Sequence, residues 1–146
     1  MDNCVTSEGE ERIMRVMIDT NIFISAILFP NGRAAEALYK ALAAPYQPVT
    51  CDYVVEELKR KFTEKFPNRI VELDVFLDSA LEAIEIVSTP KKIHDAEQFI
   101  RDKKDRPILR AALDAGADVF LTGDNDFLES SVKDPRIISV NEFMEY

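Results

Sequence analysis

The apolar run Val16-Met17-Ile18 ends directly in the polar triplet Asp19-Thr20-Asn21, and a second apolar run reaches Leu28. Residues 15–18 are too continuously apolar to alternate, which is typical of a central strand in a parallel sheet. Residues 21–28 have the length of a helix that packs back on that strand. Asp19 is therefore expected at the carboxyl edge of a strand, where open α/β sheets place their ligand sites.

The rest of the chain alternates helices with short apolar strands. Helices are predicted over residues 33–43, 53–66, 69–83 and 105–115, and strands over 49–51, 84–87, 118–122 and 136–140, with Asp52 and Asn141 as helix N-caps. This order predicts an α/β fold, a three-layer α/β/α sandwich with a central, mostly parallel sheet. The 146 residues suffice for one domain, expected over 14–146, after a disordered acidic leader over 1–13.

Charge and cysteine content limit the possible functions. A net charge of −9 argues against sequence-blind adhesion to nucleic acids or anionic membranes through the bulk field. Cys4 and Cys51 form neither a disulfide framework nor a zinc-binding spacing. No stretch approaches the roughly 18 to 20 apolar residues of a membrane span, and the first residues do not resemble a signal peptide. We therefore expect a cytoplasmic protein.

Four acids occupy equivalent places in the predicted fold: Asp19 and Asp124 follow strands, while Glu57 and Asp105 lie in the first turns of helices. In a parallel sheet these places share one rim. Two carboxylates about 4 Å apart repel by roughly 4 kcal/mol at an effective dielectric near 20, so such a cluster must take up protons or hold a hard cation. Oxygen ligands favour Mg²⁺ or Mn²⁺, which suit phosphodiester hydrolysis.

Three segments carry a resemblance to a known family: MIDTNIFISAI, VVEELKRKF and KDRPILRAALDAGADVFLTGDNDF. Together they resemble the PIN domain, particularly the small single-domain kind related to VapC toxins of toxin–antitoxin systems. The resemblance covers nearly all of the chain from Met14 onwards and implies a metal-dependent ribonuclease. It also implies a homodimer and an antitoxin protein as partners.

The resemblance assigns roles to individual residues. It implies Asp19, Glu57, Asp105 and Asp124 as catalytic acids, with Asp19, Asp105, Asp124 and Asp126 holding the metal and Asn21 and Thr122 as supporting polar neighbours. Glu56 is adjacent to Glu57 and remains an alternative. Basic residues near these acids, namely Arg33, Lys104 and Arg106, are candidates for RNA binding, where phosphate contacts add affinity without sequence information.

Simpler interpretations of the same residues stay open. Each acid alone could be a helix cap, an ion-pairing surface residue or a turn residue. Asp-x-Asn after a strand is also faintly similar to the nucleophile loop of haloacid dehalogenase phosphatases, although an aspartate is usual where Asn21 stands. A non-catalytic PIN fold that serves as a binding module is the remaining alternative to the nuclease.

Overall fold

A computed structural model describes residues 12–146. Five strands form one parallel sheet: β1 (Met14–Ile18), β2 (Tyr46–Cys51), β3 (Glu85–Val87), β4 (Val119–Leu121) and β5 (Arg136–Ile138). The helices are α1 (Thr20–Leu28), α2 (Arg33–Ala41), α3 (Asp52–Lys65), α4 (Ile70–Ser79), α5 (Arg106–Asp114), α6 (Asn125–Leu128) and α7 (Val140–Met144). Residues 1–11 of the predicted leader, including Cys4, lie outside the described part of the chain.

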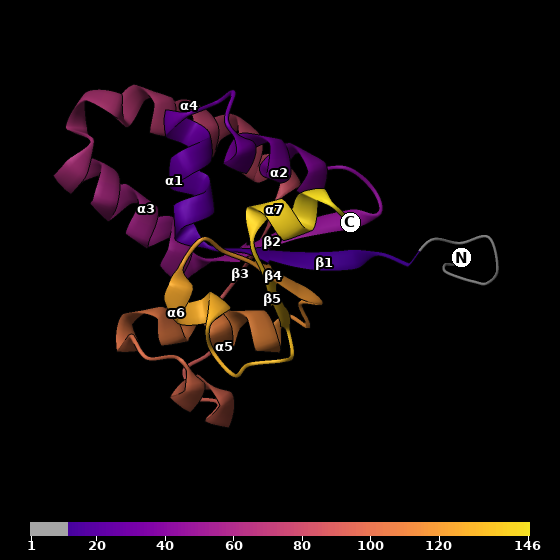
Figure 1. Ribbon diagram of the computed structural model, residues 1–146. Helices are drawn as coiled ribbons and strands as arrows, with labels where there is room; N and C mark the ends of the chain where they lie inside the picture. Colours follow the sequence, from indigo (N-terminus) through magenta and orange to yellow (C-terminus); the bar gives the residue numbers. More distant parts are fainter. Residues whose placement is uncertain (1–11) are drawn as a thin grey trace.

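The strand order β3-β2-β1-β4-β5 confirms the predicted parallel α/β architecture. Figure 1 shows α1, α2, α4 and α7 on one side of the sheet, and α5 with α6 on the other. The strands β2 and β3, which follow β1 in the sequence, lie on one side of β1 within the sheet, and β4 and β5 lie on its other side. The direction in which successive strands are added to the sheet therefore reverses between β1 and β4. Open α/β sheets bind their ligands at such a switch point, outside the carboxyl ends of the strands.

The central strand β1 is buried, as its unbroken apolar run predicts. Met17 pairs with Val49 of β2 on one side and with Phe120 of β4 on the other. The backbone N–H of Asp19 donates to the carbonyl of Leu121 at 3.1 Å, so the ladder between β1 and β4 extends to the acid itself. This bond fixes the first acid beside the loop that follows β4.

Two predicted helix caps are wrong. The helix α3 begins at Asp52, so its N-cap is Cys51. The Asp52 carboxylate accepts from the Tyr53 backbone N–H at 2.8 Å and also from the backbone N–H and the hydroxyl of Thr89, at 2.9 and 2.6 Å. Asn141 lies inside α7, whose N-cap is Ser139. Ser139 forms a reciprocal capping box with Glu142: the Ser139 hydroxyl accepts from the Glu142 backbone N–H, and the Glu142 carboxylate accepts from the Ser139 backbone N–H.

Other boundaries shift by a few residues. The predicted helix over 69–83 is α4 followed by a 3-10 helix, η2 (Ala80–Ala83), after the short 3-10 helix η1 (Pro67–Arg69). The polar connection before α5 contains two more, η3 (Asp95–Phe99) and η4 (Lys103–Asp105). None of the helices within residues 12–146 is long and apolar enough to span a membrane.

Candidate active site

Asp19 lies at the junction of β1 and α1, where it is the N-cap of the helix. Its carboxylate accepts hydrogen bonds from the Thr20 backbone N–H and from the Thr122 hydroxyl, both at 2.7 Å. The residue is only 4% exposed. Burial raises the pKa of Asp19 to about 6, although the two hydrogen bonds act to lower it, and the charges of Glu57 and Asp124 add to the rise. Asp19 is thus a helix cap and a member of an acidic cluster at once.

Glu57 reaches Asp19's surroundings from the first half of α3. Its carboxylate accepts a hydrogen bond from the Thr20 hydroxyl at 2.5 Å and pairs with Arg60 at 3.6 Å. The Glu57 side chain is 11% exposed, whereas Glu56 faces solvent. The geometry therefore favours Glu57 over Glu56 as the acid that α3 contributes.

Asp124 and Asp105 approach from the other side of the switch point. Asp124 caps α6 by accepting from the Asp126 backbone N–H, and its own N–H donates to the Thr122 hydroxyl oxygen at 2.9 Å. Asp105 ends η4 and immediately precedes α5. Burial, a hydrogen bond with Asp124 and the charges of Asp124 and Asp19 raise the pKa of Asp105 to about 8. The four predicted acids therefore converge.

One further acid belongs to this cluster. Carboxylate oxygens of Asp102, Asp105 and Asp126 lie within 4.8 Å of one another. Asp102 caps η4 by accepting from the Lys104 backbone N–H at 3.0 Å. Its place three residues before Asp105 is a signal that the sequence analysis missed, because one turn of 3-10 helix brings such residues onto one side. Asp126 is also paired with the exposed guanidinium of Arg101.

The predicted supporting residues lie beside the acids. Thr122 is fully buried and connects Asp19 with Asp124. The side-chain oxygen of Asn21 accepts from the Gly123 backbone N–H at 3.1 Å, which ties the start of α1 to the loop after β4. Both contacts fix the relative position of the two loops.

Four of these acids, Glu57, Asp102, Asp105 and Asp124, line a hollow of about 310 Å³, which we call the acidic pocket. Basic residues complete its lining: Arg60, Lys61, Lys65 and Lys104. Of the three predicted RNA-binding residues, only Lys104 lines this pocket. Arg106 lines a neighbouring hollow. Arg33 contacts Glu36 and, at 3.2 Å, Asn141 of α7.

The donor set suits a hard divalent cation. It consists of carboxylate oxygens, the ligands that Mg²⁺ and Mn²⁺ prefer, and the described residues bring no histidine or cysteine into the lining of the acidic pocket. The raised pKa values of Asp19 and Asp105 arise from burial and mutual repulsion, which a cation among them would offset. Fold and site together define a parallel α/β domain with an acidic centre at its topological switch point.

Comparison with known families identifies this domain. The family model described as "PIN domain" matches residues 15–126. The chain therefore belongs to the PIN domain family, as the sequence motifs suggested. No curated protein sequence matches the chain.

Several solved structures are similar to this chain. VapBC2 from Rickettsia felis, bound to a promoter DNA fragment, is 19% identical with a TM-score of 0.65 over 86% of this chain and 98% of that one. DNA-bound VapBC from Salmonella typhimurium is 18% identical with the same TM-score over 88% and 99%. FitAcB from Neisseria gonorrhoeae is 19% identical with a TM-score of 0.62 over 86% and 97%. At these identities the likeness establishes a VapC-like fold.

Proposed function

We propose that the protein is a Mg²⁺- or Mn²⁺-dependent endoribonuclease that hydrolyses RNA phosphodiester bonds. The observation that carries the proposal is the convergence of Asp19, Glu57, Asp105 and Asp124, four acids from four segments of the chain, at one edge of the sheet. Membership of the PIN domain family, whose members are generally nucleases, supports the same conclusion.

Asp19, Asp105, Asp124 and Asp126 would hold the metal, with Asp102 near enough to take part. A bound divalent ion supplies an activated water and neutralises charge that develops on the phosphate. Thr122 and the N–H of Thr20 keep both Asp19 oxygens oriented, so the carboxylate needs no rearrangement before it binds a cation. Asp105, with its pKa near 8, would release its proton when the cation arrives.

Glu57 has a different environment from the other acids. The Thr20 hydroxyl and Arg60 hold its carboxylate in place and leave it facing the acidic pocket. We assign it the role of a catalytic acid that orients the attacking water. Around the acids, Arg60, Lys61, Lys65 and Lys104 form a basic rim that would bind RNA phosphates in a protein of net charge −9.

The similar toxin–antitoxin complexes support a toxin role in which an antitoxin protein is the partner. The chain offers a suitable surface: α1, α2 and α4 enclose an apolar hollow of about 460 Å³. Tyr39, Val71 and Val75 at this hollow are 60%, 70% and 60% exposed. Exposed apolar patches of this kind are typical of grooves that receive an amphipathic helix of a partner.

Cleavage of single-stranded and structured RNA with Mn²⁺, and with EDTA in its place, tests the nuclease assignment. Wild-type protein should cleave RNA with Mn²⁺ and not with EDTA. Asp19→Asn and Asp124→Asn should be inactive. Glu57→Gln should lose cleavage, and its matched control Glu56→Gln should retain it, since only Glu57 lines the acidic pocket. Cleavage that persists with EDTA or in both aspartate variants would contradict the proposal.

A further inference from the structure

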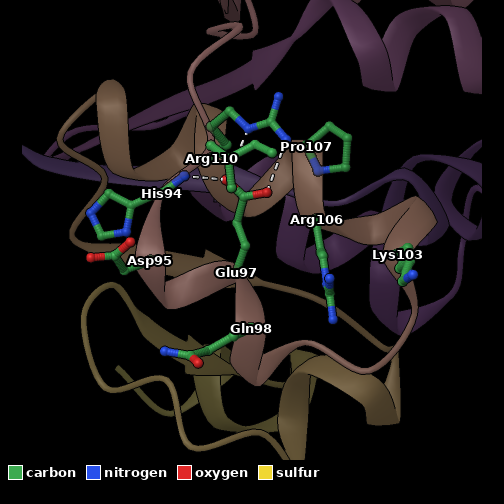
Figure 2. A pocket seen from close by; sticks show the side chains of 9 residues that line it. His94, Asp95, Glu97, Gln98, Lys103, Arg106, Pro107 and Arg110 are labelled. Carbon is green, nitrogen blue, oxygen red and sulfur yellow. Dashed lines mark hydrogen bonds and ion pairs between the residues drawn. The ribbon is translucent and has the colours of Figure 1, made fainter.

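A second hollow of about 450 Å³ adjoins the acidic pocket and has no part in the site described above. It lies between the segment around η3 and the start of α5 (Figure 2). The two hollows share the short turn η4: Lys104 and Asp105 line the acidic pocket, and Lys103 lines the second hollow. Consecutive residues of one turn therefore line the two hollows.

A buried ion pair forms a fixed wall of the second hollow. Glu97, 2% exposed, accepts two hydrogen bonds from the guanidinium of Arg110, each at 2.9 Å. The same carboxylate accepts from the His94 backbone N–H, and Arg110 also donates to the Pro90 carbonyl at 2.9 Å. Figure 2 shows Glu97 directed at Arg110 between the two sides of the hollow. The segment before α5 is therefore pinned to that helix.

The remaining charge of the second hollow is basic. With Glu97 and Arg110 compensating each other, Lys103 and Arg106 face a single acid, Asp95. The Arg106 Nε donates to the Ile100 carbonyl at 2.9 Å, which anchors the guanidinium. Within residues 12–146, the Arg106 terminal nitrogens have no hydrogen-bond or ion-pair partner, and neither has the Lys103 ammonium. Both cations are available to an anionic ligand.

A third hollow of about 480 Å³ continues the path and shares Ile93, His94 and Arg110 with the second. The α5 residues that line the two hollows follow helical spacing along one face of α5: Arg106, Pro107, Arg110, Leu113 and Asp114. At 1.5 Å per residue, nine residues of α5 extend about 13 Å away from Asp105. We call the two hollows together the α5 groove.

The α5 groove also carries surfaces on which bases can stack. The His94 Nδ1 accepts from the Ala96 backbone N–H at 3.0 Å, which holds the imidazole in one orientation at the groove. Ile93 beside it is 69% exposed. Proteins that bind single strands combine a positive groove, which follows the backbone, with aromatic side chains on which the bases stack.

We propose that the α5 groove binds the single-stranded RNA segment adjacent to the scissile phosphate, with Lys103 and Arg106 contacting backbone phosphates and His94 stacking on a base. This inference depends on the proposed function for its ligand. It extends that function by assigning a path for the substrate away from the acids, which the acidic pocket alone does not give.

Binding of a short fluorescein-labelled single-stranded RNA, followed by anisotropy in EDTA over a series of salt concentrations, tests the groove without requiring cleavage. Arg106→Gln and Lys103→Gln should each weaken binding roughly threefold to tenfold and lower the slope of log affinity against log salt by roughly 0.7. His94→Ala should weaken binding with the salt slope unchanged. Arg69→Gln is the matched control, because Arg69 also donates to a backbone carbonyl but belongs to an exposed pair with Glu72.

The proposal is overturned if wild-type protein binds no RNA, if Arg106→Gln and Lys103→Gln bind like wild type, or if Arg69→Gln weakens binding equally. Cleavage by wild type with Mn²⁺, measured in parallel, separates the two claims. RNA binding that depends on Arg106 without any cleavage would contradict the nuclease and retain the groove. Cleavage that is unchanged by the substitutions of Lys103 and Arg106 would contradict the groove and retain the nuclease.

Discussion

The Thr122 hydroxyl donates to the Asp19 carboxylate at 2.7 Å and simultaneously accepts from the Asp124 backbone N–H at 2.9 Å. One buried side chain at the end of β4 thus connects the acid after β1 with the acid that caps α6. Because β1 and β4 are neighbours at the switch point, this link depends on the strand order and not on proximity in sequence.

Thr122→Val removes the hydroxyl while keeping the shape of the side chain. We expect Mn²⁺ affinity and RNA cleavage to fall roughly tenfold to a hundredfold, as is typical for residues that orient metal ligands. Stability should fall by about 1–2 kcal/mol, because the Asp124 N–H and an Asp19 oxygen lose a partner. Thr122→Ser should retain most activity. Equal activity in Thr122→Val and wild type, measured by cleavage rates and calorimetry, would show that the link is dispensable.

The metal-free protein should lose stability as pH rises from about 4 to about 8. The pKa values of Asp19 and Asp105 are raised to about 6 and about 8, so the folded state binds more protons than the unfolded state in this window. Thermal unfolding with EDTA should give a falling Tm, and Mn²⁺ should reverse much of the fall. Asp105→Asn should stabilise the metal-free protein at pH 8 and change little at pH 4. A Tm that rises through this window would contradict the clustering.

Glu97→Gln should destabilise the fold by roughly 2–4 kcal/mol, because it leaves the Arg110 charge buried without its partner. Glu85→Gln, which breaks the more exposed pair with Arg15, is the control and should cost less than about 1 kcal/mol. Arg110 holds the pKa of Glu97 below its ordinary value, so this stabilisation is present above about pH 4.3 and is lost as pH falls below it. Chemical denaturation at pH 7 and pH 3 measures both effects; an equal cost for the two variants would refute the distinction.

Tyr53→Phe should loosen the turn that carries Asp105. The Tyr53 hydroxyl donates to the Lys104 carbonyl at 2.6 Å and so ties η4 to α3. We expect a stability loss under about 1.5 kcal/mol and faster amide hydrogen exchange in η4, with exchange in β1 unchanged. Exchange rates in η4 that match the wild type would exclude a positioning role for this hydroxyl.

Much of the fold followed from local patterns. The buried run before Asp19 and the alternation of helices and strands predicted the parallel sheet, and each predicted acid follows a strand or lies near the start of a helix. The caps at Asp52 and Asn141 were wrong because α3 already includes Asp52 and because Ser139 offers a complete capping box with Glu142. Both outcomes depend on where the helix begins, which composition and periodicity leave undetermined.

The site was less accessible to sequence reasoning. Asp102 joins the cluster only because η4 turns it toward Asp105, and the polar connection gave no periodic signal for that turn. Arg33 is near Asp19 in sequence, but α1 carries the chain away and Arg33 contacts α7 instead. Lys104 and Arg106 are two residues apart and line different hollows, a division set by where η4 ends and α5 begins.

The proposed function requires that these carboxylates form one binding site for a divalent ion. Anomalous diffraction from crystals soaked in Mn²⁺ tests it most directly. We expect a peak among the side chains of Asp19, Asp105 and Asp124 that disappears in Asp124→Asn crystals. Absence of any peak there, or manganese bound at a different part of the surface, would contradict it.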